Sequence, residues 1–120
     1  MEATQLLDRH FAGVSLRELA ELDGVRSPET MRQRLVEAKR SHITEMAGRL
    51  MVARRNQEVL WLLVPGTSGA DLHAGLQYID WLLRELEEVT FRCRVHFKTK
   101  PDGVAIGLEE YIDAEEADRA

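Results

Sequence analysis

The sequence predicts an α+β protein in which an N-terminal helical bundle is followed by a small β-α-β-β lobe. Up to about residue 54, apolar residues recur at spacings of three and four, between serine, proline and glycine residues typical of helix ends. Beyond residue 56, two alternating segments and one apolar run are typical of strands, and a further amphipathic stretch lies between them. A chain of 120 residues suits one ordinary domain or two small ones. We expect units at 1–55 and 56–120.

Two short helices are predicted in the first 25 residues. Residues 3–11 have the spacing of an amphipathic helix, which Gly13 ends. Ser15 and Glu18 form a capping-box sequence that opens a second helix, and Asp23-Gly24 ends it after about two turns. The residues expected to face inward are Leu6, Leu7, His10, Phe11, Leu16, Leu19, Ala20 and Val25.

A third helix begins at Ser27-Pro28, because serine is a good N-cap and proline suits the first helical position. Its inward residues are Met31, Leu35 and Ala38. We expect Ser41 to cap a separate fourth helix that runs to about Arg54. Residues 50–57 also fit a strand and turn leading into the next segment, an alternative that the pattern leaves open.

The second half predicts one helix among three strands. Residues 59–64 are an apolar run typical of a buried strand, closed by 65–69. A helix capped within 68–71 then runs to about residue 88, and 91–99 alternates as a strand. After a turn at 100–103, residues 104–108 form the second arm of a hairpin, and the acidic tail 113–120 is expected to fray. The helix is expected to bury Leu72, Leu76, Ile79, Leu83 and Leu86.

Residues 14–36 resemble the tri-helical helix-turn-helix of bacterial regulators, resolvases and sigma-factor-like proteins. The matching stretches are Val14-Ser15-Leu16-Arg17-Glu18-Leu19-Ala20-Glu21-Leu22-Asp23-Gly24-Val25 and Ser27-Pro28-Glu29-Thr30-Met31-Arg32-Gln33-Arg34-Leu35. Small Ala20 lets two helices cross closely, Gly24 permits a positive φ in the turn, and Val25 fills the angle between the helices. Arg26 stands where the compact pattern has no residue, so we expect a turn one residue longer. The resemblance implies that the third helix enters a DNA major groove.

A helical wheel with Met31 inward turns a polar face of the third helix outward. Gln33 is suited to adenine, Arg32 or Arg40 to guanine or phosphate, and Val36 to a thymine methyl group. The alternative for each arginine is a solvated charge or a pair with Glu29 or Glu37. The DNA-binding residues expected from the resemblance are Arg26, Ser27, Glu29, Thr30, Arg32, Gln33, Val36 and Arg40.

The charge distribution supports this placement. The net charge is −5, yet residues 1–55 hold ten basic and eight acidic residues, whereas 56–120 hold six basic and thirteen acidic. Within 24–55 there are eight basic and three acidic residues, so the basic stretch contains the expected recognition helix. An acidic remainder limits nonspecific phosphate binding without excluding a local contact.

No catalytic or cofactor site is expected, and the protein is predicted not to be an enzyme. Cys93 and His96 would face opposite sides of a strand, so they cannot chelate one metal ion, and Cys93 has no evident base beside it. A single cysteine cannot form an internal disulfide. The start of the chain lacks the pattern of a signal peptide, and no apolar run is long enough to span a bilayer. We therefore expect a cytoplasmic protein without a membrane partner.

The lobe carries two candidate interaction surfaces. Ala74, Tyr78 and Trp81 form a second apolar set on its helix, which suggests a homodimer interface or a site for another protein. The alternative is that this set packs on the N-terminal helices of the same chain. The second surface is a basic strand face, for which cross-strand pairing with Glu109 or Glu110 is favoured over phosphate binding. The face comprises Arg92, Arg94, His96 and Lys98, continued by Lys100.

The sequence thus predicts a sequence-specific binder of double-stranded DNA, a small transcriptional regulator of prokaryotic or phage type. Two alternatives remain open. A phage DNA-packaging protein similar to a small terminase, or a recombination accessory protein, also joins a small helix-turn-helix to an assembly lobe. A protein-interaction module would use the same bundle without binding DNA.

Overall fold

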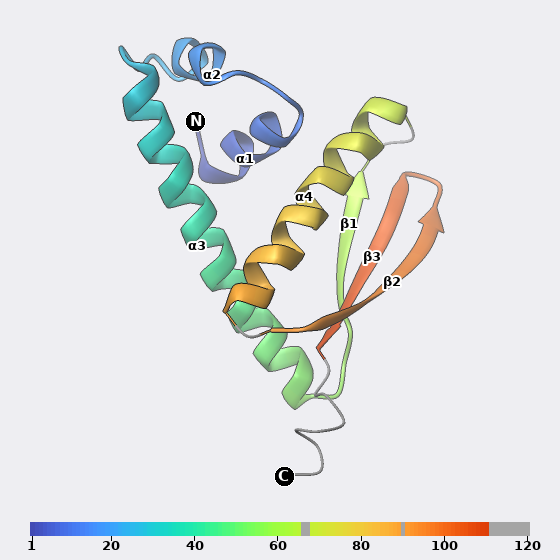
Figure 1. The fold of residues 1–120 in the computed structure, drawn as a ribbon. Helices are drawn as coiled ribbons and strands as arrows, with labels where there is room; N and C mark the ends of the chain where they lie inside the picture. Colours follow the sequence, from blue (N-terminus) through green and yellow to red (C-terminus); the bar gives the residue numbers. More distant parts are fainter. Residues whose placement is uncertain (66–67, 90, 111–120) are drawn as a thin grey trace.

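The computed structural model describes residues 1–65, 68–89 and 91–110. It is an α+β fold, as predicted, with helices preceding a small antiparallel sheet (Figure 1). In chain order the elements are α1 (Ala3–Phe11), α2 (Leu16–Leu22), α3 (Pro28–Arg55), β1 (Leu60–Pro65), α4 (Gly69–Glu88), β2 (Cys93–Lys100) and β3 (Gly103–Glu110). The predicted tail 113–120 and part of the predicted 65–69 turn lie outside the described residues.

The helix starts are set by local capping, as the sequence indicates. The hydroxyl of Ser15 accepts a hydrogen bond from the Glu18 amide at 3.2 Å, and the hydroxyl of Ser27 accepts one from the Thr30 amide at 3.2 Å. Ser68 caps α4 in the same way. Each cap satisfies an amide that has no partner within its helix, so these boundaries are encoded by a few neighbouring residues.

The prediction of a separate fourth helix capped by Ser41 is wrong, because α3 is one continuous helix of 28 residues. Serine lowers helix propensity only slightly, and no proline or glycine interrupts the chain there. His42 is half-buried and continues the inward stripe at helical spacing across the expected break. The buried residues of this stripe are Met31, Leu35, Ala38, Met46, Leu50 and Ala53.

Side chains of α3 pack into two hydrophobic clusters. The first joins Leu6, Leu7, Leu19 and Ala20 to the N-terminal half of α3. The second joins Met46 and Leu50 of α3 to α4 and the sheet; its other buried members are Val64, Ile79, Leu82, Leu86, Ile106 and Leu108. The boundary expected at residue 55 coincides with the end of α3, and the C-terminal half of that helix packs into the lobe.

The sheet has the strand order β1-β3-β2, with both pairs antiparallel. The register places Leu62 and Phe97 on either side of Ile106, so these three side chains share the face on which α4 packs. Trp61 and His96 flank Gly107 and lie on the opposite face. The sheet therefore has one apolar face, which is turned toward α4, and an opposite face that is basic and aromatic.

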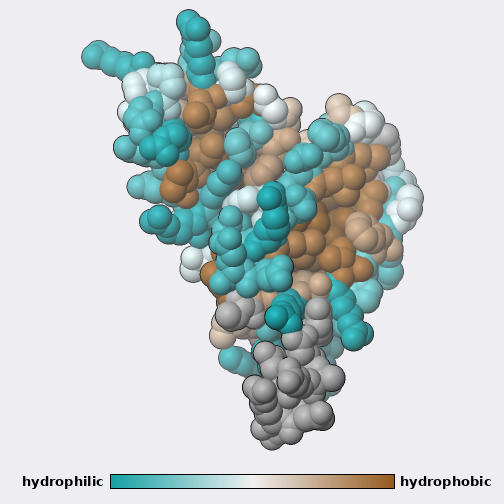
Figure 2. All heavy atoms as spheres, in the orientation of Figure 1, coloured by the Kyte–Doolittle hydropathy of each residue, from teal (hydrophilic) through white to brown (hydrophobic). Residues whose placement is uncertain are grey.

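The helix α4 leaves part of the apolar sheet face uncovered. Leu76, which the sequence places in the core, is 54% exposed, and Phe97 is 61% exposed, whereas Leu82 is fully buried. The inward face of α4 is therefore rotated from the predicted one. Figure 2 shows an apolar area over α4 and the neighbouring sheet.

Candidate nucleic-acid interface

The turn between α2 and α3 comprises residues 23–27 and has the conformation that the sequence indicates. Gly24 adopts φ +69°, a left-handed conformation that favours glycine. The amide of Val25 donates a hydrogen bond of 2.9 Å to the carbonyl of Ala20, and the side chain of Val25 packs against the first cluster. This turn accommodates Arg26 and places the start of α3 beside the end of α2.

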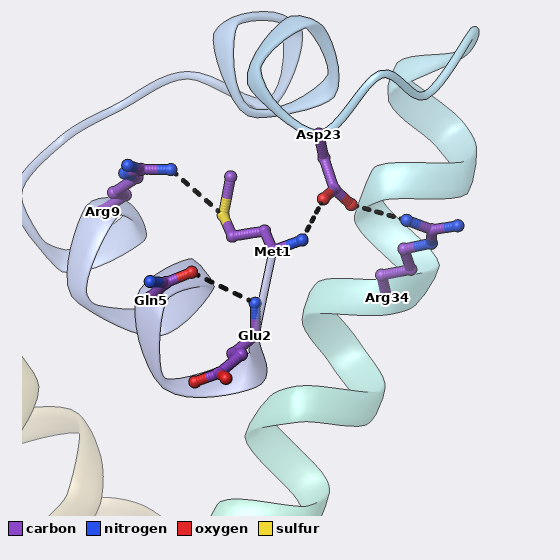
Figure 3. Close-up of polar contacts among 6 residues, drawn as sticks. All are labelled: Met1, Glu2, Gln5, Arg9, Asp23 and Arg34. Atoms are coloured by element: carbon purple, nitrogen blue, oxygen red, sulfur yellow. Dashed lines mark hydrogen bonds and ion pairs between the residues drawn. The ribbon is translucent and has the colours of Figure 1, made fainter.

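Asp23 connects this turn to two other segments (Figure 3). Its Oδ1 accepts a hydrogen bond of 2.6 Å from the Met1 amino group, and its Oδ2 accepts one of 2.5 Å from Nη1 of Arg34. These hydrogen bonds, from the amino group first and from Arg34 second, lower the pKa of Asp23 below its ordinary value. No local pattern in the sequence predicts this arrangement, which orients the expected recognition helix against the rest of the bundle.

The N-terminal half of α3 has a buried side and an exposed side. Met31 and Leu35 pack in the first cluster, and Val36 on the other side is 42% exposed. All eight residues predicted to contact DNA lie in the N-terminal half of α3 or directly before it. Ser27 is half-buried because it caps the helix, and the others are exposed: Arg26, Glu29, Thr30, Arg32, Gln33, Val36 and Arg40.

Arg32 is paired within α3, which is the alternative that the sequence left open. Its Nε and Nη2 donate hydrogen bonds of 3.0 and 2.6 Å to the two carboxylate oxygens of Glu29. This pairing lowers the pKa of Glu29. The pair is exposed, so an incoming phosphate or base edge can replace Glu29 at little cost. Among the described residues, the guanidinium groups of Arg26 and Arg40 have no ion pair, and they are available without this exchange.

The basic strand face is engaged with neighbours in the sheet. His96 Nε2 lies 3.9 Å from a carboxylate oxygen of Glu109, and Lys98 Nζ lies 4.8 Å from the centre of the Trp61 ring. The register also places Arg94 opposite Glu109. These contacts agree with the cross-strand pairing that the sequence favoured for this face.

Tyr78 and Trp81 pack against the N-terminal helices of the same chain. The ring of Phe11 lies 5.5 Å from the Tyr78 ring and 5.2 Å from the Trp81 ring, between centroids. His42 Nε2 lies 2.5 Å from the Tyr78 hydroxyl oxygen. For Ala74, Tyr78 and Trp81, the sequence left open either a dimer interface or packing within the same chain. The observed contacts of Tyr78 and Trp81 are of the second kind, and they join the bundle to the lobe.

The junction also holds groups that sequence reasoning did not single out. Lys39 Nζ lies 5.7 Å from the ring centres of both Phe11 and Trp81, a cation–π arrangement. Burial lowers the pKa of His42 and raises the pKa of Tyr78 to about 12. Both groups are therefore neutral near pH 7. In the sequence, these groups could have been found from the positions of His42 and Lys39, which lie on or beside the inward stripe of the third helix.

The thiol of Cys93 is a poor candidate nucleophile. Burial, followed by the negative charge of Glu110, raises its pKa to about 11, so it stays protonated at neutral pH. Within 1–65, 68–89 and 91–110, no group of three or more histidine, cysteine or carboxylate side chains is placed to hold a metal ion. None of the helices in those ranges combines the length and apolar character needed to cross a membrane.

Comparisons with family models, with curated proteins and with solved structures gave no match for this chain.

Proposed function

We propose that this protein binds double-stranded DNA in a sequence-specific way through the N-terminal half of α3, as a small transcriptional regulator. The proposal depends on the arrangement of α2 and α3. A turn in which Gly24 has a positive φ joins the two helices, and Met31 and Leu35 anchor α3 in the first hydrophobic cluster. That anchoring leaves a ridge of polar residues on the outer side of α3. A helix presented in this way fits the major groove of B-DNA.

The ridge offers groups of different chemistry along one helix face. Gln33 is placed to read adenine, because its amide can donate and accept together. Val36 offers an apolar contact to a thymine methyl group, and Arg40 and Arg26 offer charge to phosphates or guanine. Arg32 adds a further charged contact when its guanidinium group leaves the Glu29 carboxylate and binds DNA.

Selection of duplexes from a random pool, followed by affinity measurements between 50 and 200 mM salt, tests the proposal. Arg40→Ala should lower the slope of log affinity against log salt by about one, as expected for the loss of one phosphate contact. Gln33→Ala should leave that slope unchanged and relax the preference at one base pair. Arg84→Ala, on α4 and paired with Asp80, is the matched control and should alter neither quantity.

The outcomes separate the alternatives. A dimer that binds one enriched duplex supports a regulator, since paired copies read two half-sites. A larger ring with the same DNA affinity supports a packaging or recombination role. If no duplex is enriched and no salt-dependent binding appears, the proposal is wrong and the bundle serves protein contact.

A further inference from the structure

A cleft of about 640 Å³ lies between the N-terminal bundle and the lobe. One wall is α1, the opposite wall is α4 with β1, and His42 of α3 contributes between them. Its volume falls within the range of small-molecule sites in proteins, roughly 300–1,000 Å³. Most of the lining is apolar: Leu7, Phe11, Leu62, Val64, Ala74 and Tyr78. The cleft is separate from the outer face of α3, so the proposed DNA contact does not use it.

The charged groups of the cleft have one sign. Asp8 of α1 and Asp71 of α4 line it, and the described residues of its lining include no lysine or arginine. In the part of the chain that the structure describes, neither carboxylate takes part in an ion pair. Burial lowers the pKa of His42, so this ring adds no positive charge at neutral pH. The cleft therefore combines an apolar interior with two carboxylates that have no ion pair among the described residues. The cations that act on its walls, Lys39 over the Phe11 ring and Arg49 near His42 and Tyr78, are not among its described lining residues.

Further features of the walls favour a cation that has an apolar body. The aromatic rings of Phe11 and Tyr78 line the cleft, and such rings attract ammonium groups. The Phe11 ring already holds the ammonium group of Lys39, 5.7 Å from its centre. Three consecutive residues of β1, Leu62 to Val64, line the cleft, although neighbouring strand side chains point to opposite faces. The strand thus presents its outer edge there, where backbone carbonyls can accept hydrogen bonds from an amine.

We propose that this cleft binds a small organic cation, an ammonium group carried on an apolar body. The apolar part lies against Leu7, Val64 and Ala74, and the ammonium group is held by Asp8 or Asp71. Such a ligand would contact α1 and α4 together, and would thereby stabilise the junction between the bundle and the lobe. This binding does not depend on whether α3 contacts DNA.

Three probes of similar size and different charge test the proposal: 2-phenylethylamine, 2-phenylethanol and phenylacetate. Binding to the intact protein at pH 7.5 is followed by tryptophan fluorescence and by amide chemical shifts. We expect the amine to bind at least tenfold more tightly than the alcohol and phenylacetate to bind more weakly still. The shifted amides should belong to α1, β1 and the first half of α4.

Charge-neutralising variants locate the site. Asp71→Asn and Asp8→Asn should each weaken amine binding about five- to tenfold and leave binding of the alcohol unchanged. Asp80→Asn, which removes an exposed carboxylate of α4 outside the cleft, is the control and should change neither affinity. Equal affinities for amine and alcohol, or an amine affinity unaltered in both cleft variants, would overturn the proposal. Shifts confined to the outer strand face would also overturn it.

Discussion

Arg34 donates a 2.5 Å hydrogen bond from its Nη1 to Oδ2 of Asp23, across the turn that precedes α3. The carboxylate of Asp23 is only 8% exposed, and it also accepts a hydrogen bond from the amino group of Met1. One side chain thus joins the N-terminus that precedes α1, the turn and the expected recognition helix (Figure 3). Arg34 is therefore a positioning residue, whereas the arginines on the outer ridge of α3 face solvent.

Asp23→Asn is expected to lower the melting temperature and to remove part of the acid sensitivity of the fold. Because the pKa of Asp23 is lowered in the folded state, its contribution is present above the ordinary carboxyl pKa and is lost as pH falls through the folded-state value. Thermal unfolding at pH 7, 5 and 3 measures this contribution. The difference between wild type and variant should be largest at pH 7 and shrink toward pH 3. A constant difference across this range would contradict the electrostatic explanation.

Gly24→Val is expected to destabilise the protein by about 1 kcal/mol or more, because a β-branched residue at positive φ is strained. Gly48 provides a matched control, since it lies within α3 and an added Cβ meets no atom within 4 Å. Gly48→Ala should raise stability by about 0.5–1 kcal/mol through helix propensity. Urea unfolding of both variants provides the test. Equal midpoints for wild type and Gly24→Val would show that the turn tolerates a side chain.

Much of the bundle is predictable because its signals are local. Ser15 and Ser27 satisfy amides three residues away, and Gly24 supplies the one backbone conformation that the turn requires. The outer face of α3 follows from the position of Met31 alone, since helical spacing fixes which neighbours point away from it. These features require no knowledge of the tertiary structure.

The features that sequence reasoning missed depend on contacts between distant residues. The continuity of α3 through Ser41 follows from one helix packing into two clusters. Packing of Tyr78 on the N-terminal helices was one of two interpretations that the sequence left open, and its contact with Phe11, far away in the chain, became clear only in the fold. The pairing of Asp23 with Arg34 spans a turn whose geometry was not known beforehand. The cleft also forms only when α1, β1 and α4 are brought together.

The helix α4 packs tightly on β1 at Gly75, where an added Cβ would overlap the side chain of Val64. Gly75→Ala should therefore cost about 2 kcal/mol of overpacking, which exceeds the helix-propensity gain of about 1 kcal/mol. In the background of Val64→Ala, the same substitution should be neutral or stabilising, because Val64 Cγ1, the atom that the added Cβ would overlap, is absent and only Cβ of residue 64 remains close, at 3.2 Å. A double-mutant cycle from urea unfolding measures this coupling. If the effects of Gly75→Ala and Val64→Ala on the free energy of unfolding were additive, α4 would be able to shift away from β1 without a loss of stability.

The stability of the junction between α3 and α4 should decrease on acidification. Burial lowers the pKa of His42 below its ordinary value of 6.5, and burial followed by the charge of Lys39 does the same for His10. The unfolded chain takes up protons near pH 6.5 while these folded histidines remain neutral. The free energy of unfolding should therefore fall as pH drops through 6.5, until the folded histidines also become protonated.

Urea midpoints at pH 7.5, 6.5 and 5.5 test this dependence. The charged neighbours of His42 are Asp8 of α1 together with Glu45 and Arg49 of α3. His42→Gln retains a partner for Tyr78 but cannot titrate, so it should flatten the profile. His73→Gln, at an exposed position of α4, is the control and should retain the wild-type slope. If His42→Gln kept the wild-type dependence of the urea midpoint on pH, groups other than His42 would cause the acid sensitivity.

The protein is expected to self-associate through the part of the apolar sheet face that α4 leaves uncovered. Phe97 and Leu76 are both more than half exposed, and Phe97 shares a sheet face with the buried core residue Ile106. A second copy seated on this face would cover both side chains. Contact along the free edge of β2 is disfavoured, because Lys98 and Lys100 of two copies would approach each other.

Light scattering across a dilution series from 100 to 1 μM tests this arrangement. We expect a dimer at the higher concentrations, and we expect Phe97→Glu to produce a monomer that unfolds as cooperatively as wild type. Leu63→Glu is the matched control, because Leu63 is 51% exposed but lies on the opposite face of the sheet, beside Ala105. It should leave the dimer intact. A monomeric wild type throughout the series would exclude this interface, and a dimer lost only in Leu63→Glu would place the contact on the basic face instead.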